Sequence, residues 1–352
     1  MYIIVAILAF GILIATHELG HFLLAKACGV KVNEFAIGMG PALLKKQRGE
    51  TLYSLRALPI GGFCAMEGED GDSQDERSFG RQKAWKRFLI LIAGSAMNFL
   101  TGLIIVILIF SGAEAFAGNT IDALEPGFEY GGEQGLMIGD KIVSIDGHRV
   151  FYSRDFSNYM ARSTGGSIDM VIERDGERIL IDDFGLSKKN FVIDGQTVEK
   201  YGITFNIISA TAGERLKYSL YSTYDFIRLV KMGLTDLITG AVGVKDMSGV
   251  VGIVSTINEV GEQSASVSAA MLNIAYICAF IAVNLAVMNM LPIPALDGGR
   301  VLFLIITTVI EKITRRKLDT KYEAYINAVC LGLLMLLMIY IMFNDVLRIV
   351  NG

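Results

Sequence analysis

The chain has 352 residues, of which 52% are hydrophobic and 19% charged, and its formal net charge is -4. Soluble globular proteins carry about 25% charged residues, so this composition indicates a membrane protein and argues against a soluble domain. The small acidic balance also argues against nucleic acid as a partner, because nucleic-acid-binding surfaces are strongly basic.

Four stretches are long and apolar enough to cross a bilayer, which takes about 20 mostly apolar residues. They cover residues 2–25, 88–112, 269–291 and 323–343. The first could be mistaken for a signal peptide, but it lacks a basic start and a small-residue cleavage site, so we interpret it as a retained helix. The short loops after the first and third stretches are rich in Lys and Arg, as cytoplasmic loops are. Both termini and the region 113–268 are therefore expected on the opposite side.

The loop between the first two spans contains TLYSLRALPIGGFCAMEGE, residues 51–69. Its alternating side chains, together with Pro59 and the Gly61-Gly62 pair, predict a β-hairpin or a re-entrant loop over 51–66. Backbone of this kind can lie at membrane depth only where protein or water covers it. An ordinary solvated loop is an equal alternative at this point.

Residues 119–205 are expected to form a separate small domain. The sequence predicts a strand pair around Gly139–Gly147, a helix over SRDFSNYMARS capped by Ser153, and a hairpin around Asp175-Gly176. Together these elements resemble a PDZ domain of the bacterial protease type, chiefly through the GD-x-I-x-x-I-x-G core. PDZ domains bind extended peptides by adding a strand to a sheet edge. A small β-rich spacer without a peptide ligand is the alternative.

The segment 213–240 is predicted to be an amphipathic helix, because its apolar side chains recur at steps of three and four residues. These side chains are Leu216, Leu220, Tyr224, Ile227, Val230, Leu234 and Leu237. A position at the membrane surface is the natural interpretation. Packing against the PDZ-like domain is the alternative.

The first span ends in ATHELGHFLLAK, residues 15–26. On an α-helix His17 and His21 are one turn apart and project from the same face, so both imidazoles can reach one zinc ion. Glu18 lies next to that face, where it can take a proton from a water molecule at the metal. Ionisable groups at membrane depth are costly and usually mark function. Two buried histidines satisfied by hydrogen bonds would leave Glu18 in the same turn unexplained.

A catalytic zinc ion takes three protein ligands and water, so a third ligand is required. The strong candidate is Asp297 in NMLPIPALDGGR, because Pro292 and Pro294 cannot continue the third span and Gly298-Gly299 lets the backbone turn sharply. Without the HExxH pattern, an ordinary turn with a capping aspartate would be favoured. His148 belongs to the PDZ-like region, on the wrong side. The four cysteines form no CxxC pair and are expected to be apolar fillers.

HExxH in the first span and N-x-x-P-x-P-x-L-D-G-G over Asn289–Gly299 resemble the site-2 protease family of intramembrane zinc metalloproteases. The PDZ-like domain between the second and third spans further resembles the RseP-type branch of that family. GVKVNEFAIGMGP, LPIGGF and AGSAMNF are similar to the flanking segments of the family, so the resemblance covers nearly the whole chain.

The resemblance implies specific roles for five residues: His17, His21 and Asp297 as zinc ligands, Glu18 as the catalytic glutamate, and Asn289 as an aid to substrate or oxyanion binding. It also implies that 51–66 is a membrane-inserted β-loop that engages the substrate as a strand. The sequence departs from the family in two places. Val250 in MSGVVGI stands where the family usually has proline. Only one PDZ domain fits, whereas some relatives have two, so the size filtering of substrates can differ.

The sequence therefore predicts a polytopic α-helical membrane protein with four transmembrane helices, a membrane-associated β-hairpin and an inserted α+β PDZ domain. The expected divisions are the first half of the protease core, the PDZ domain, an amphipathic helix with a connecting segment, and the second half of the core. They cover residues 1–118, 119–205, 206–268 and 269–352.

The expected activity is zinc-dependent hydrolysis of peptide bonds within the transmembrane segments of single-span substrates in the bilayer. The resemblance implies regulated intramembrane proteolysis in the cytoplasmic (inner) membrane of a bacterium, of an anti-sigma factor or of signal peptide remnants. A peptide C-terminus or substrate segment would occupy the PDZ domain. At about 1.5 Å per residue, His21 lies roughly 7–8 Å and His17 roughly 13 Å from Lys26, so the site is expected near the cytoplasmic side.

Two alternatives come from other classes. A metal-free PDZ-bearing scaffold would not need the intact set His17, Glu18, His21 and Asp297. A transporter would be expected to show a repeated pair of broken helices, which the sequence does not show.

Overall fold

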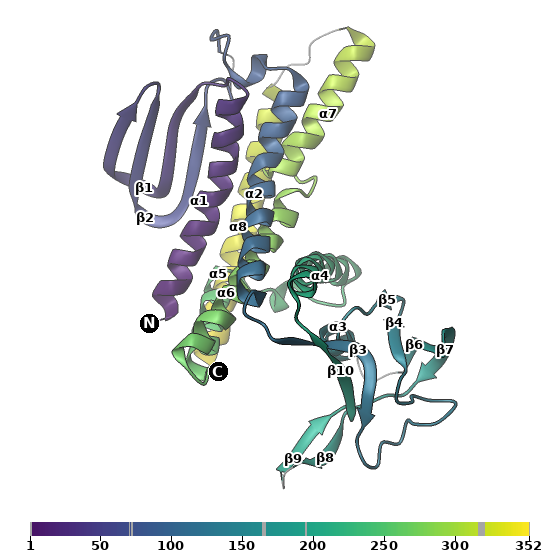
Figure 1. Cartoon of the computed structure of the whole chain (residues 1–352). Helices are drawn as coiled ribbons and strands as arrows, with labels where there is room; N and C mark the ends of the chain where they lie inside the picture. The colour runs from purple at the N-terminus through teal and green to yellow at the C-terminus, as the bar shows by residue number, and fades with distance from the viewer. Residues whose placement is uncertain are drawn as a thin grey trace. The chain divides into compact units, whose positions relative to one another are not determined.

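The computed structural model describes residues 2–69, 71, 73–163, 167–193, 196–315 and 321–351. The chain divides into two compact units, one formed by 1–109 with 222–352 and the other by 110–221. The first unit holds the long helices and the N-terminal sheet, and the second is a small domain of strands and one short helix (Figure 1).

Four helices of the first unit are long and apolar enough to cross a membrane among the residues described. They are α1 (Tyr2–Ala27), α2 (Ala84–Phe110), α6 (Val267–Asn289) and α8 (Lys321–Asn351), the last with its apolar part at Tyr325–Arg348. Large apolar side chains such as Ile4, Leu8 and Ile12 point outward from α1, as lipid-facing residues do. The prediction of four long apolar helices at these positions is therefore confirmed.

Glycines let α2 approach its neighbours closely. A Cβ atom on Gly20 of α1 would overlap the Ala93 carbonyl group of α2. A Cβ atom on Gly102 of α2 would lie 2.7 Å from Val283 and 2.9 Å from the Ala279 carbonyl oxygen, both on α6. Small residues at helix contacts are typical of membrane proteins, because backbones that touch gain van der Waals packing that lipid does not supply.

The hairpin was predicted to lie entirely within 51–66, and the position of its turn is wrong. The two arms are β1 (Val32–Arg48) and β2 (Thr51–Met66), so 51–66 supplies only the second arm. Arg48 pairs with Thr51 across a two-residue turn in which Gly49 has a positive φ of 61°. Glycine is favoured there because a side chain would strain that backbone conformation.

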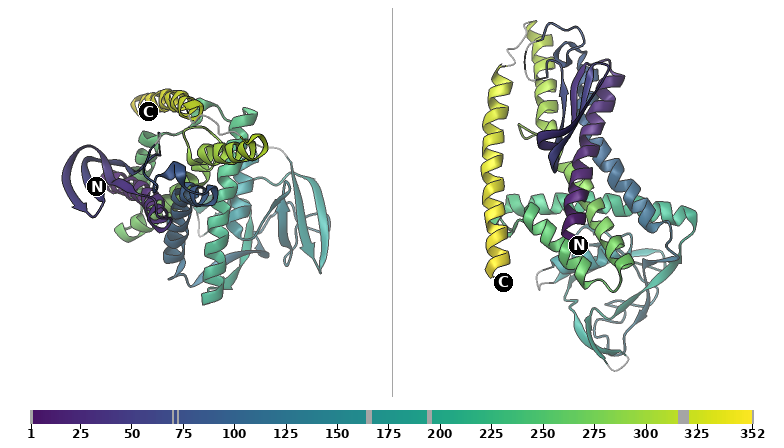
Figure 2. Two further views of the ribbon diagram at one scale, coloured as in Figure 1. Left: turned by 90° about the horizontal axis from the view of Figure 1, so that it is seen from above. Right: turned by 90° about the vertical axis from the view of Figure 1, so that its left-hand side faces the viewer.

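Both arms bend, so that four rows of backbone lie in one sheet beside α1 (Figures 1 and 2). Residues 34–37 pair with 62–65 on one side and with 52–55 on the other, and 42–48 pair with 51–56. The row from Gly62 to Met66 therefore forms one edge of the sheet. A Cβ atom on Gly62 would lie 3.5 Å from Glu18 Cγ, so this edge passes directly beside the HExxH face of α1.

The segment 210–266, ahead of the third span, contains more helix than expected. The predicted amphipathic helix is present as α4 (Ala212–Thr239), and it is followed by η2 (Val244–Asp246) and α5 (Val250–Gln263). Leu216, Leu220 and Tyr224 of the predicted apolar face are each half exposed. The sequence reading missed α5, whose Ile257 is fully buried in a cluster with α1 and α6.

The second unit is built on an antiparallel sheet with the strand order β10-β3-β4-β6-β7, in which β5 also pairs with β4. Its elements are β3 (Ala115–Leu124), β4 (Lys141–Ile145), β5 (His148–Arg149), α3 (Ser153–Arg162), β6 (Ile168–Arg174), β7 (Glu177–Phe184), β8 (Lys189–Ile193), β9 (Gln196–Lys200) and β10 (Ile203–Ser209). The remaining strands, β8 and β9, form a separate hairpin. The predicted hairpin around Asp175-Gly176 is confirmed as β6 and β7.

The helix predicted over SRDFSNYMARS is present as α3, but Ser153 does not cap it. Ser153 is the first helical residue and Tyr152 occupies the N-cap position. The Asp155 carboxylate instead accepts hydrogen bonds from the amides of Phe151 (2.6 Å) and Tyr152 (3.3 Å). The Ser153 hydroxyl donates to the Ala117 carbonyl oxygen over 3.3 Å, so the aspartate in the first turn, and not the serine, serves the N-terminus of α3.

All four cysteines are free, as expected. Cys28 and Cys64 lie in the apolar cluster between α1, α2 and the sheet, and Cys278 lies in the cluster of α1, α5 and α6. These three are therefore small members of the core.

The first turn of α5 is capped by a residue from the last span. The amides of Gly249 and Gly252 donate to Asp345 Oδ2 over 2.9 and 2.8 Å, and Asp345 is 2% exposed. A helix N-terminus has unpaired amides and a partial positive charge, so a carboxylate is well placed there. Val250, which departs from the family pattern, is the first residue of α5.

We predict that Asp345→Leu lowers the thermal unfolding temperature, because it leaves two amides at the α5 N-terminus without this acceptor. The expected cost is about 1–2 kcal/mol. Unfolding followed in detergent micelles measures it, and Asp345→Asn, which keeps an acceptor oxygen, should lose less. An Asp345→Leu protein that unfolds at the wild-type temperature would contradict this role.

Candidate metal centre

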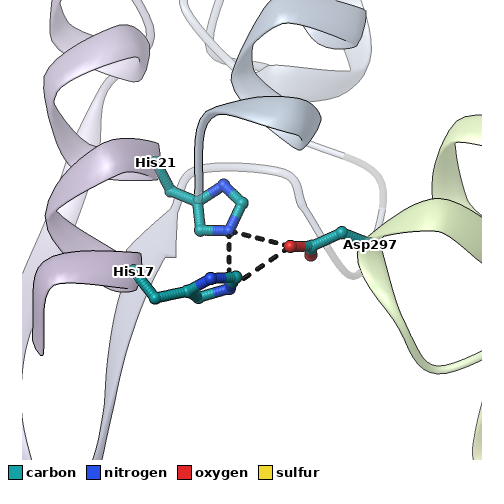
Figure 3. Close-up of side chains that lie close together, drawn as sticks. All are labelled: His17, His21 and Asp297. Atoms are coloured by element: carbon teal, nitrogen blue, oxygen red, sulfur yellow. Dashed lines mark hydrogen bonds and ion pairs between the residues drawn. The ribbon is translucent and has the colours of Figure 1, made fainter. Parts of the chain in front are cut away.

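Three side chains from two distant parts of the chain converge at one point (Figure 3). His17 and His21 project from α1, and Asp297 is the first residue of α7 (Asp297–Thr314). Asp297 Oδ2 lies 3.2 Å from His17 Nε2 and 3.3 Å from His21 Nε2, and the two Nε2 atoms are 3.2 Å apart. The three residues predicted as metal ligands are therefore brought together.

The triangle of these three atoms fits a tetrahedral ion. Zinc lies about 2.0–2.1 Å from nitrogen and oxygen ligands, which places tetrahedral ligands about 3.3–3.4 Å apart. The observed separations are close to that value. Asp297 Oδ2 is buried and has no hydrogen bond of good geometry among the described residues. Two imidazoles and one carboxylate are also the donor set of many catalytic zinc sites.

A tight connection between α6 and α7 presents Asp297. The predicted reason, a sharp turn at Gly298-Gly299, is wrong: the positive φ, 76°, belongs to Ala295. The glycines serve close approach instead. A Cβ atom on Gly298 would overlap the Met290 carbonyl oxygen, and one on Gly299 would overlap the Ile293 carbonyl group. Glycine at both positions therefore lets α7 begin directly against the end of α6.

Helix α2 packs against both histidine side chains. The sequence analysis did not predict this contact. His21 Nδ1 lies 2.8 Å from the Ile90 carbonyl oxygen, and His17 Nδ1 lies 3.4 Å from the Asn98 amide nitrogen. A Cβ atom on Gly94 would overlap His21 Nε2 and lie 2.6 Å from His17 Cε1. The sequence does contain a signal for this contribution. Ile90, Gly94 and Asn98 follow one another at steps of four residues, which places them on one face of a helix.

The three side chains line a cavity of about 400 Å³. Its other walls are Glu18, the β2 residues 63–66, Glu69, Leu91 and Arg300. Arg300 Nη1 lies 2.5 Å from Glu69 Oε1, so an ion pair joins α7 to the loop after β2. Among the described residues, Asn289 is half-buried at the end of α6 and does not line this cavity.

We predict that Gly94→Ala abolishes stoichiometric metal binding, because the added methyl group occupies the space of the His21 imidazole. Metal content of the purified protein measures this effect. Gly102→Ala is the matched control: it crowds the α2–α6 contact but not the histidines, so it should lower stability and keep the metal. Normal metal content in Gly94→Ala would contradict the geometry of the site.

Comparison with known proteins identifies the chain. Peptidase family M50 matches residues 5–337. A Clostridium acetobutylicum protein whose name denotes a zinc metalloprotease is 36% identical over 353 residues, covering 99% of this chain and 98% of its own. The regulator of sigma-W protease RasP of Bacillus subtilis is 26% identical over 437 residues, covering 99% and 98%. Because these matches span both chains almost completely, the protein belongs to peptidase family M50, the site-2 proteases, and is a membrane zinc metalloprotease.

Proposed function

We propose that the protein cleaves peptide bonds within the transmembrane segments of single-span membrane proteins, at a zinc ion held by His17, His21 and Asp297. The supporting observation is the convergence of these three ligand atoms beside Glu18, at the end of an apolar helix. A relative is named a regulator of sigma-W protease, which supports a role in regulated intramembrane proteolysis. An anti-sigma factor is therefore the proposed class of substrate.

Glu18 is proposed as the general base. When bound, zinc polarises the scissile carbonyl and lowers the pKa of water. Glu18 lines the same cavity as the three ligands, so its carboxylate can take the proton of the attacking water and return it to the leaving amine. Arg300, held by Glu69, adds a positive charge to the wall. Asn289 keeps its proposed role in substrate or oxyanion binding through the family resemblance alone.

The edge row Gly62–Met66 is proposed to hold the substrate as an added strand. This row borders the sheet, and its residues 63–66 line the cavity. A helical substrate hides its peptide bonds, so it has to unwind before attack. Pairing with a sheet edge replaces the helical hydrogen bonds that unwinding breaks, which matters most where water is scarce.

The proposed location is the cytoplasmic (inner) membrane of a bacterium, with both termini and the second unit outside the cytoplasm. The basic residues between α1 and α2 and at the end of α7 support this orientation, because short cytoplasmic loops are rich in Lys and Arg. Lys26 follows His21 by five residues, so the site would lie near the cytoplasmic side.

The second unit is proposed to be a PDZ domain that binds a substrate segment or a peptide C-terminus and limits access. In its sheet β10 pairs only with β3 among the described strands, so one edge of β10 can accept a peptide strand. Phe156 of α3 packs beside this strand, with its ring centroid 5.5 Å from that of Tyr201 and 5.2 Å from that of Phe205. A helix next to a free strand edge is the arrangement that such domains use.

The assignment predicts that Glu18→Gln keeps zinc and abolishes cleavage, because an amide cannot act as a base. Zinc content and cleavage of a pre-trimmed single-span substrate, measured on the same purified protein, test this prediction. Asp297→Asn is the comparison variant: it keeps the side-chain size but should lose most of the zinc affinity. Chelator-sensitive cleavage at the wild-type rate by Glu18→Gln would refute the proposed base.

The gating role predicts that a protein without residues 115–209, the sheet of the second unit, still cleaves pre-trimmed substrates and also accepts untrimmed ones. Ala115 pairs with Ser209, and the Ala210 amide donates to the Glu114 carbonyl oxygen, so the ends to be joined are adjacent. Residues 115–209 can therefore be replaced by a short Gly-Ser linker. Loss of all cleavage by a folded deletion protein that still binds zinc would count against the gate.

A further inference from the structure

We infer that Asn98 is a positioning residue that determines which ring nitrogen of His17 carries the proton. It thereby allows the His17 proton to lie on Nε2 when the metal is absent and on Nδ1 when the metal is bound. The inference rests on the proposed role of His17 as a zinc ligand. It begins with the helix face of α2 that lies against the histidines, where Ile90, Gly94 and Asn98 follow one another at four-residue steps.

His21 has a fixed tautomer. Its Nδ1 atom lies 2.8 Å from the Ile90 carbonyl oxygen, which can only accept a hydrogen bond. Nδ1 therefore carries a proton, and Nε2 is the ring nitrogen that faces Asp297. Outer hydrogen bonds of this kind orient metal-binding histidines in many proteins.

His17 meets a different partner. Its Nδ1 atom lies 3.4 Å from Asn98 Nδ2, and Asn98 Oδ1 lies 3.4 Å from Thr16 Oγ1. The Thr16 hydroxyl also donates to the Leu13 carbonyl oxygen over 2.9 Å. Asn98 is 1% exposed, so water cannot replace these contacts. A carboxamide differs from a backbone carbonyl because it offers both a donor and an acceptor.

The two orientations of this carboxamide suit the two states of His17. With Nδ2 toward the ring, the amide donates to Nδ1, and the imidazole proton lies on Nε2, 3.2 Å from Asp297 Oδ2. A half-turn of the amide places Oδ1 toward the ring, where it accepts from a protonated Nδ1. The lone pair of Nε2 is then available to a metal ion, and Nδ2 donates to Thr16 Oγ1, whose own proton still reaches Leu13.

The half-turn exchanges two atoms of nearly equal size, so it requires no movement of the surrounding heavy atoms. A carboxylate at position 98 could only accept and would hold His17 in the metal-binding tautomer. A leucine could do neither and would leave Nδ1 without a partner in a buried site. Asparagine is therefore the residue that supports both states of His17.

Two variants and one control test this inference. Asn98→Leu should weaken zinc binding about 10- to 100-fold in competition with a chromophoric chelator, the usual effect of losing an outer partner of a metal-binding histidine. Asn98→Asp should bind zinc at least as tightly as the wild type. Ser95→Ala, which removes a buried hydroxyl from the same helix without touching either histidine, should leave the affinity unchanged.

The tautomer can be observed directly, because the chain has only three histidines. Nitrogen NMR of histidine-labelled, metal-free protein in detergent should show His17 protonated at Nε2 in the wild type and at Nδ1 in Asn98→Asp. His21 should stay protonated at Nδ1 in every variant, which verifies that α1 and α2 still pack together.

Identical His17 tautomers in the wild type and Asn98→Asp, or equal zinc affinity of the wild type and Asn98→Leu, would overturn the role of Asn98 and leave the zinc site standing. Failure of the wild type to bind zinc would overturn the proposed site as well, so the two failures are distinguishable.

Discussion

The site depends on the close approach of α1 and α2. Gly20 faces the Ala93 carbonyl, and Gly94 faces both imidazoles, so the two helices touch through backbone atoms over the turns that carry HExxH. The same contact supplies Ile90 and Asn98 as partners of the histidines. In lipid there is little hydrophobic drive to hold helices together, so packing of small residues and buried hydrogen bonds has to do so. Structural and chemical demands therefore fall on the same face of α2.

The remaining elements of the first unit bring distant parts of the chain to this helix pair. Asp297 arrives from α7, and the Arg300–Glu69 ion pair ties that helix to the loop after β2. Asp345 of the last span caps α5, which in turn packs against α1 and α6. The first two contacts join the N-terminal part of the unit to its C-terminal part, and the third holds α5 in place against α1. A carboxylate takes part in all three contacts. Buried charge is costly in lipid unless it is paired or binds a metal, so each of these carboxylates needs its partner.

The edge of the sheet relates the metal centre to the proposed substrate. Gly62 lies beside Glu18, and the row that continues from it forms one wall of the cavity. A strand added at this row would run past the proposed base and the three ligand atoms. A Cβ atom on Gly62 would lie 2.9 Å from the Ala36 carbonyl oxygen, so glycine lets these two rows pair closely beside Glu18. The bends in β1 and β2 place this row at the border of the sheet.

Local periodicity and composition are enough to predict several features of the protein. Four apolar stretches predict four long helices whatever surrounds them, and a four-residue step puts His17 and His21 on one face of any α-helix. The need for a third zinc ligand predicts Asp297, which lies beside both histidines in the structure. Asp175-Gly176 also predicts its hairpin correctly, because a two-residue turn depends only on residues that are adjacent in the chain.

Contacts between segments distant in the chain determine which residues support the site. Pairing of 34–37 with two different segments depends on contacts between β1 and β2, so the turn could not be placed from the alternating pattern in 51–66. Gly298 and Gly299 suggest a turn in the sequence, yet they serve helix contact, because the need for a missing Cβ is visible only when the neighbour is known. In the sequence, Asn98 is only a polar residue within an apolar helix, and its role depends on the position of α1. Its partner is then a ring nitrogen 81 positions away, and that separation puts the contact beyond any local pattern.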